Sequence, residues 1–133
     1  MHGGGAAMKR QELPDGTEIT GFYVRTVKVG PHVFVSGTTC LDPKGRVVGR
    51  NAAEQTRATM KKIVAALKRG GADMDDITRL VIYCTDIRDG EAIIGEIARF
   101  QNKSRPASTL VAITALAKPG LLVEIEATAT IAD

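Results

Sequence analysis

Two glutamates near the C-terminus are the acidic side chains best placed to do chemistry in this chain of 133 residues. Glu124 and Glu126 lie in segment 121–131, where apolar and polar residues alternate. Alternation predicts a β-strand, so both carboxylates should share one face. Repulsion between them can raise the pKa of Glu124, which suits a general acid or base. The same position also suits a glutamate that accepts hydrogen bonds at a contact between subunits.

The other nucleophiles and metal-binding side chains do not form a recognisable site. Cys40 and Cys84 are too few for a disulfide framework and have no metal-ligand spacing. His2 and His32 are far apart in the sequence, so we expect no zinc or iron site. Ser108 has no histidine partner that could activate it as a nucleophile.

Charge and composition exclude some classes of function. The net charge of +3 invites a nucleic-acid interpretation, but basic and acidic residues are interspersed, and two tyrosines, three phenylalanines and no tryptophan leave few side chains for stacking on bases. The densest basic groups, Lys61-Lys62 and Lys68-Arg69, belong to the solvated face of a predicted helix. No apolar run approaches the ~18 residues of a membrane span. The N-terminus has no hydrophobic signal core, so we expect a cytoplasmic protein without membrane contact.

The first half of the chain predicts a hairpin followed by a helix. Segments 23–29 and 33–37 have the patterns of two strands, joined by a turn at Gly30-Pro31-His32. A short extended piece follows at 46–48. Asn51 and Glu54 have the spacing of a capping box, and Gly70-Gly71 ends the helix that they begin.

The second half predicts a buried strand, a helix and two more strands. Segment 77–85 is almost continuously apolar, as in a central strand. Asp89 can cap a second helix whose inward residues would be Ile93, Ile94, Ile97 and Phe100. A strand should run from Pro106 through Ser108 to Ile113. In the last strand, the core face would carry Leu121, Val123, Ile125, Ala127, Ala129 and Ile131.

This order of elements predicts a two-layer α+β sandwich, because two helices can cover only one face of a mixed sheet. We expect residues 1–20 to form a flexible leader (1–7) and an N-terminal extension, and residues 21–133 to form a single domain. The uncovered sheet face carries Phe34 and Leu122 among polar residues, which predicts an oligomer.

Six short motifs, in this order and spacing, resemble the Rid/YjgF family, whose members are also described as L-PSP endoribonucleases and translation inhibitors. They are Tyr23, the run Val33-Phe34-Val35-Ser36-Gly37-Thr38-Thr39, Ala53-Glu54-Gln55-Thr56, Thr85-Asp86, Arg105-Pro106-Ala107-Ser108 and Val123-Glu124-Ile125-Glu126-Ala127. The resemblance covers about residues 21–131. It implies a chorismate-mutase-like fold and a homotrimer with a central barrel and three ligand clefts between subunits. It also implies cofactor-free hydrolysis of reactive imines and enamines such as 2-aminoacrylate.

The resemblance places Tyr23, Gly37 and Glu124 at pocket positions of the family. Ser108 stands where the deaminases carry the arginine that holds the substrate carboxylate, and Arg88 stands where they often carry asparagine. A serine hydroxyl gives a neutral hydrogen bond of about 1 kcal/mol, against roughly 1.5–3 kcal/mol for a charged one. The chain therefore resembles a branch that lacks the deaminase arginine.

Three arginines are candidates for the missing cation. Arg88 could supply it from the start of the second helix, or could simply pair with Asp86 or Asp89. Arg105 has an odd offset from Ser108 and should point to the opposite face of the strand. Arg25 lies near Tyr23 on the first predicted strand.

Three functions remain open after these observations. The first is an enzyme that acts on a small imine, enamine or related metabolite in a cleft between subunits, without being a standard 2-aminoacrylate deaminase. The second is a non-catalytic or regulatory trimer that binds a small carboxylate- or carbonyl-bearing metabolite. An endoribonuclease or translation inhibitor is the third, for which the composition gives little support.

Overall fold

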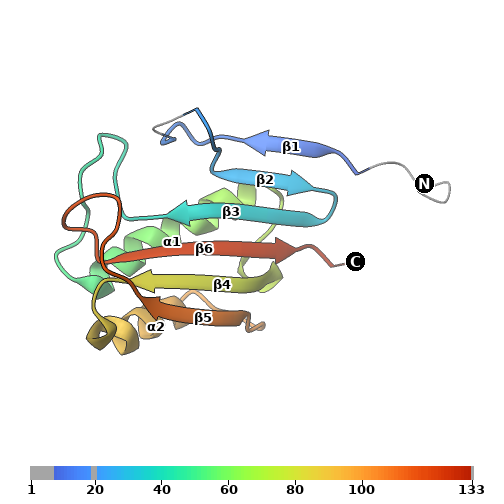
Figure 1. Cartoon of the computed structure of the whole chain (residues 1–133). Helices are drawn as coiled ribbons and strands as arrows, with labels where there is room; N and C mark the ends of the chain where they lie inside the picture. Colours follow the sequence, from blue (N-terminus) through green and yellow to red (C-terminus); the bar gives the residue numbers. More distant parts are fainter. Residues whose placement is uncertain (1–7, 19–20, 133) are drawn as a thin grey trace.

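A six-stranded mixed sheet with two helices on one face makes up this chain in the computed structural model, which describes residues 8–18 and 21–132 (Figure 1). The strands are β1 (Arg10–Leu13), β2 (Thr26–Val29), β3 (His32–Thr38), β4 (Ile77–Cys84), β5 (Ala107–Ala112) and β6 (Val123–Thr130). Their order in the sheet is β1-β2-β3-β6-β4-β5, and β4 and β5 are the parallel pair. The helices are α1 (Ala52–Arg69) and α2 (Gly90–Ala98), with 3-10 turns η1 (Met74–Asp76) and η2 (Ile87–Asp89). The predicted two-layer α+β sandwich is confirmed.

The sheet begins before residue 21, where we expected the domain to start. Strand β1 pairs antiparallel with β2 at the edge of the sheet. Its first three side chains are exposed and polar, so the sequence carries no alternation that would mark it as a strand. Residues 1–7, the expected flexible leader, lie outside the described residues. The expected piece at 46–48 contributes only a single bridge, between Leu41 and Val47.

The core lies between the sheet and the helices. Along β6, the buried residues are Val123, Ile125, Ala127 and Ala129, and the residues between them are half-buried on the other face. Helix α1 begins at the predicted N-cap, where the Asn51 side chain accepts a hydrogen bond from the Glu54 amide at 2.9 Å. The Glu54 carboxylate accepts from the Arg50 amide at 3.0 Å instead of the Asn51 amide, so the second bond of the capping box does not form.

Helix α2 differs from the prediction at its start and at one residue in its middle. Ile94 is 46% exposed rather than inward-facing. Asp89 makes no side-chain cap, because η2 runs directly into α2 and Asp86 caps η2 one turn earlier by accepting from the Arg88 amide.

A β-bulge between β3 and β6 shapes the part of the sheet that matters for the site. Val35 pairs with Ala127 and Thr38 pairs with Ile125, so Ser36 and Gly37 together face the one residue between them, Glu126. Bulges of this kind bend a strand and re-aim its side chains, often next to functional sites. The bulge places the backbone of Gly37 against the polar face of β6.

Candidate functional site

A cavity of about 290 Å³ lies at the bulge and brings together three of the residues that the sequence singled out. Tyr23, Gly37 and Glu124 all line it, and we call it the Glu124 pocket. Tyr23 precedes β2, Gly37 lies on β3 and Glu124 on β6. The rest of the wall comes from the N-terminal segment 16–18, Arg25, the loop after β3, α1 and the loop before β6.

Gly37 and Glu124 are in close contact. A Cβ at position 37 would lie 2.6 Å from Oε2 of Glu124, closer than real Cβ atoms approach any atom. The backbone of Gly37 is not in the left-handed region, so a larger residue would conflict with the space taken by the carboxylate, which would have to move, and not with the backbone conformation. The contact fixes the Glu124 carboxylate against the bulge.

Burial raises the pKa of Glu124 above its usual range, and the neighbouring charge of Glu126 raises it further, although Arg25 acts in the opposite direction. No residue in the described part of the chain donates a hydrogen bond to this carboxylate. Glu126, in contrast, accepts a hydrogen bond of 2.6 Å from the Tyr83 hydroxyl. Glu124 is therefore a half-buried carboxyl group whose proton is easily retained and which faces a cavity.

Arg25 is buried beside the pocket and holds its wall together. Its guanidinium donates to the Gly37 carbonyl at 2.7 Å and lies 5.6 Å from the centre of the Tyr23 ring. Asp15 neutralises it through an ion pair of 3.3 Å in which both side chains are at most 10% exposed. Burial would raise the pKa of Asp15, but hydrogen bonds from Thr17 and the charge of Arg25 lower it overall. The sequence named Arg25 as a candidate cation but did not indicate Asp15 as its partner.

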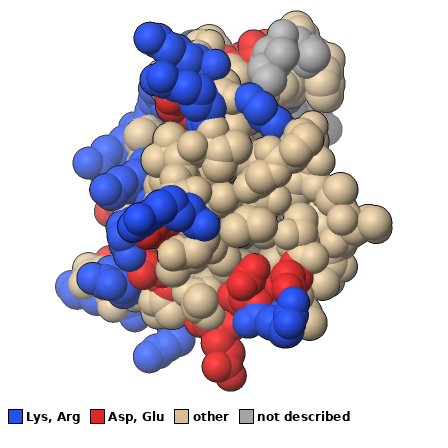
Figure 2. Space-filling view, turned by 90° about the vertical axis from the view of Figure 1, so that its left-hand side faces the viewer, with Lys and Arg blue, Asp and Glu red and all other residues tan. Residues whose placement is uncertain are grey.

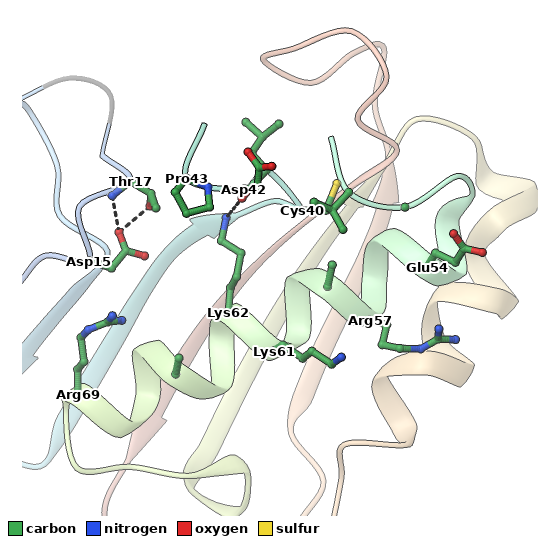
Figure 3. A pocket seen from close by; sticks show the side chains of 15 residues that line it. Asp15, Thr17, Cys40, Asp42, Pro43, Glu54, Arg57, Lys61, Lys62 and Arg69 are labelled. Carbon is green, nitrogen blue, oxygen red and sulfur yellow. Dashed lines mark hydrogen bonds between the residues drawn. The ribbon is translucent and has the colours of Figure 1, made fainter. Parts of the chain in front are cut away.

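Lys62 was expected on a solvated face but is half-buried at the pocket wall. It rises from α1 to the loop after β3, where its ammonium donates to the carbonyls of Thr39 at 2.7 Å and Leu41 at 2.9 Å (Figure 3). Burial lowers the pKa of Lys62, and the charge of Arg25 lowers it further. Lys62 lines both the Glu124 pocket and a neighbouring cavity of about 610 Å³ that lies over the outer side of α1.

Arg88 and Ser108 lie apart from the Glu124 pocket within one chain. Arg88 forms an ion pair of 2.7 Å with Asp86 on the surface, which lowers the pKa of Asp86 to about 2. Ser108 on β5 is in register with the buried Leu80 and so faces the helices. Glu124 is in register with Tyr83 on the other face of the sheet. The two groups could meet only across a boundary between chains.

Arg105 does not lie opposite Ser108 as we expected. It precedes β5, so strand alternation does not apply to it, and both residues line a hollow of about 170 Å³ beneath α2. The prediction failed because the strand begins at Ala107, after Pro106.

The surface carries charges of both signs and an uncharged area. On the face turned towards the viewer in Figure 2, basic side chains gather along one side with acidic ones among them, beside a broad uncharged area. Within residues 8–18 and 21–132, no three His, Cys, Asp or Glu side chains are grouped so that they could hold a metal ion. None of the helices described is both long and apolar enough to cross a bilayer.

Comparisons with known proteins agree on one family. The family model described as endoribonuclease L-PSP matches residues 16–131. A RutC family protein from Pyrococcus abyssi is 32% identical over 110 residues, which is 82% of this chain and 86% of that protein. The 2-iminobutanoate/2-iminopropanoate deaminase of Salmonella typhimurium is 29% identical over 112 residues, 82% and 87% of the two chains. A YjgF-family crystal structure from Mycobacterium tuberculosis, 38% identical, superposes with a TM-score of 0.83 over 92% of this chain and 100% of that chain.

Proposed function

The chain belongs to the Rid/YjgF family, and we propose that it is a cofactor-free hydrolase of a small imine, enamine or related metabolite that binds in the Glu124 pocket. One observation carries the proposal. Glu124 is half-buried, its pKa is raised, and its carboxylate is held against Gly37 without a hydrogen-bond donor among the described residues. A relative bears the name of a 2-iminobutanoate/2-iminopropanoate deaminase, which supports this chemical class.

Hydrolysis of an imine needs one group that can take a proton and give it back. In the proposed reaction, the Glu124 carboxylate removes a proton from water as the water oxygen bonds to the imine carbon. The protonated Glu124 returns that proton to the nitrogen, which gives a carbinolamine. Glu124 then removes the hydroxyl proton of the carbinolamine and passes it to the nitrogen, so that the C–N bond breaks, ammonia leaves and the carbon becomes a carbonyl. A carboxyl group with a raised pKa suits these steps near neutral pH, and such catalysis contributes typically ~10²–10⁴-fold to a rate.

Ser108 makes a standard 2-aminoacrylate deaminase a poor description of the chain. The resemblance places the carboxylate-holding arginine of active deaminases at this position, and a neutral hydroxyl cannot provide a bidentate charged contact. The proposed substrate is therefore a small molecule that is held by other groups.

We propose further that the protein is a homotrimer whose subunits meet through the sheet face opposite the helices. That face exposes Phe34 (44%) and Val111 (39%). Strand β5 lies at the edge of the sheet, and in the proposed trimer this edge of one subunit, with Ser108, would lie beside the Glu124 pocket of another. Sedimentation equilibrium tests it: we expect three times the 14.1 kDa of one chain, and a monomer would refute it.

Imines generated in place by an amino-acid oxidase test the enzymatic function. We expect the protein to speed the loss of imine and the release of ammonia above the buffer rate, for several amino acids with small side chains. Rates equal to buffer for every imine would remove the hydrolase proposal.

A second candidate is a non-catalytic trimer that binds a small metabolite in the same pocket. The uncharged Ser108 favours it, because the missing arginine should reduce the rate of catalysis more than the affinity for a neutral part of a ligand. Thermal stabilisation by a carboxylic or keto acid, together with no turnover of any imine, would select this candidate.

A further inference from the structure

We propose that Lys62 is the residue that binds the carboxylate of the ligand in the Glu124 pocket, in place of the cation that Ser108 lacks. The inference rests on the proposed function, in which Glu124 acts on the imine group of the ligand, and it assigns Lys62 to the carboxylate of that ligand. The ligand is taken to be a small 2-imino acid, the class that the name of the Salmonella typhimurium relative indicates, or its 2-oxo counterpart.

The position of Lys62 is fixed by the protein itself. An ammonium group has three N–H donors, and two of them point to the carbonyls of Thr39 and Leu41. These carbonyls belong to the loop that forms the wall of the pocket. The third N–H has no acceptor among the described residues, so it can donate to a ligand without breaking a contact.

The charge of Lys62 is only partly balanced by acids: Asp15 and Asp42 are near enough to raise its pKa, but burial and the charge of Arg25 outweigh them. Arg25, the other cation of the pocket wall, is paired with Asp15. In the described part of the chain, Lys62 has no carboxylate within ion-pair distance, although it is half-buried and close enough to Arg25 to feel its charge. A half-buried cation that is left with only neutral acceptors gains most from an anionic ligand.

The geometry of the pocket suits a short ligand with an anion at one end. Lys62 enters from α1 and Glu124 from β6, on different walls of one cavity of about 290 Å³. Lys61 and Arg57 line the neighbouring cavity of about 610 Å³, which Figure 3 shows, and not the Glu124 pocket. A short ligand with its carboxylate at Lys62 would extend into the cavity that Glu124 also lines.

Calorimetric titration with pyruvate, the 2-oxo acid that corresponds to 2-iminopropanoate, tests the assignment, with methyl pyruvate as its uncharged analogue. The variant Lys62→Gln keeps amide donors for the two carbonyls but removes the charge. Lys61→Gln removes the same charge from the neighbouring, exposed position. We expect Kd for pyruvate to rise at least tenfold in K62Q and less than twofold in K61Q, with methyl pyruvate unchanged in both.

Lys62→Arg keeps a positive charge and should bind pyruvate more tightly than K62Q does. This variant decides the result if K62Q binds neither pyruvate nor methyl pyruvate. Equal pyruvate affinity in wild type and K62Q, no pyruvate binding by wild type, or no recovery in K62R would each overturn the inference. Imine turnover is measured on the same samples. If the protein turns over imines but binds pyruvate independently of Lys62, only the role of Lys62 is refuted. If pyruvate binding depends on Lys62 but no imine is turned over, only the hydrolase function is refuted.

Discussion

Oε2 of Glu124 occupies the space in which any residue other than glycine at position 37 would place its Cβ, with a separation of only 2.6 Å. The two residues come from β3 and β6, strands that pair through a bulge at this point. Because of the bulge and the glycine, the backbone of β3 can lie directly against the carboxylate on β6. Coupling between substitutions at positions 37 and 124 therefore tests whether the two residues compete for the same space.

Gly37→Ala should push the Glu124 carboxylate away from the bulge. The cost in unfolding free energy should lie at or below the lower end of the about 1–3 kcal/mol of core overpacking, because the displaced oxygen is the flexible end of a side chain. The same substitution should cost far less in an Glu124→Ala background, where the carboxylate is gone. Chemical denaturation of the four proteins of this double-mutant cycle measures the coupling. Additive effects would mean that the two side chains do not compete for the same space.

Asp15→Asn should destabilise the fold by about 3 kcal/mol, because it leaves the buried Arg25 without its counter-ion. The matched control is Glu12→Gln, which removes a carboxylate from the exposed pair with Arg10 and should change stability by less than about 0.5 kcal/mol. A similar loss in both variants would contradict the role of the pair.

The same variant should change how stability depends on pH. The pKa of Asp15 is lowered in the folded state, so the wild type has the stabilisation above the unfolded pKa and loses it as the pH falls through the folded value. The difference in melting temperature between wild type and D15N should therefore shrink on acidification. A constant difference would contradict this linkage.

Glu124→Gln should make the protein more stable at neutral pH. The pKa of Glu124 is raised by burial, so the stabilising contribution is complete below the unfolded pKa and is lost as the pH rises through the folded value. The amide does not titrate and avoids that loss. Melting curves should show the variant gaining on the wild type between acid and neutral pH. A variant that is less stable at neutral pH would show that the carboxylate is structural.

Ser108→Arg should raise kcat/KM for 2-iminopropanoate at least tenfold if neighbouring subunits bring β5 to the Glu124 pocket. Ser108 is exposed, so the longer side chain can be accommodated. Ser104→Arg is the control, since it adds the same charge at an exposed position in the loop before β5. Equal rates in both variants would show that residue 108 does not reach the substrate.

Alternation and capping residues made most of the fold predictable. Strand β6 and helix α1 follow directly from their patterns, because each buries one face or stripe against the other layer. Strand β1 could not be predicted, since its side chains are exposed and only its backbone hydrogen bonds make it a strand.

The site was only partly predictable for a related reason. Tyr23, Gly37 and Glu124 were named from the sequence and do meet. The bulge, the Asp15–Arg25 pair and the position of Lys62 depend on contacts between distant segments, which leave no periodic signal. Lys62 in particular looks like any lysine on a helix until the loop after β3 closes over it.

The imine hydrolysis rate of Glu124→Gln tests the central claim most directly. The variant keeps the size of the side chain and, on the argument above, the stability of the fold, so a change in rate reports on the proton alone. With 2-iminopropanoate generated in place, we expect kcat to fall by ~10²-fold or more. A folded Glu124→Gln protein that releases ammonia as fast as the wild type would contradict the account.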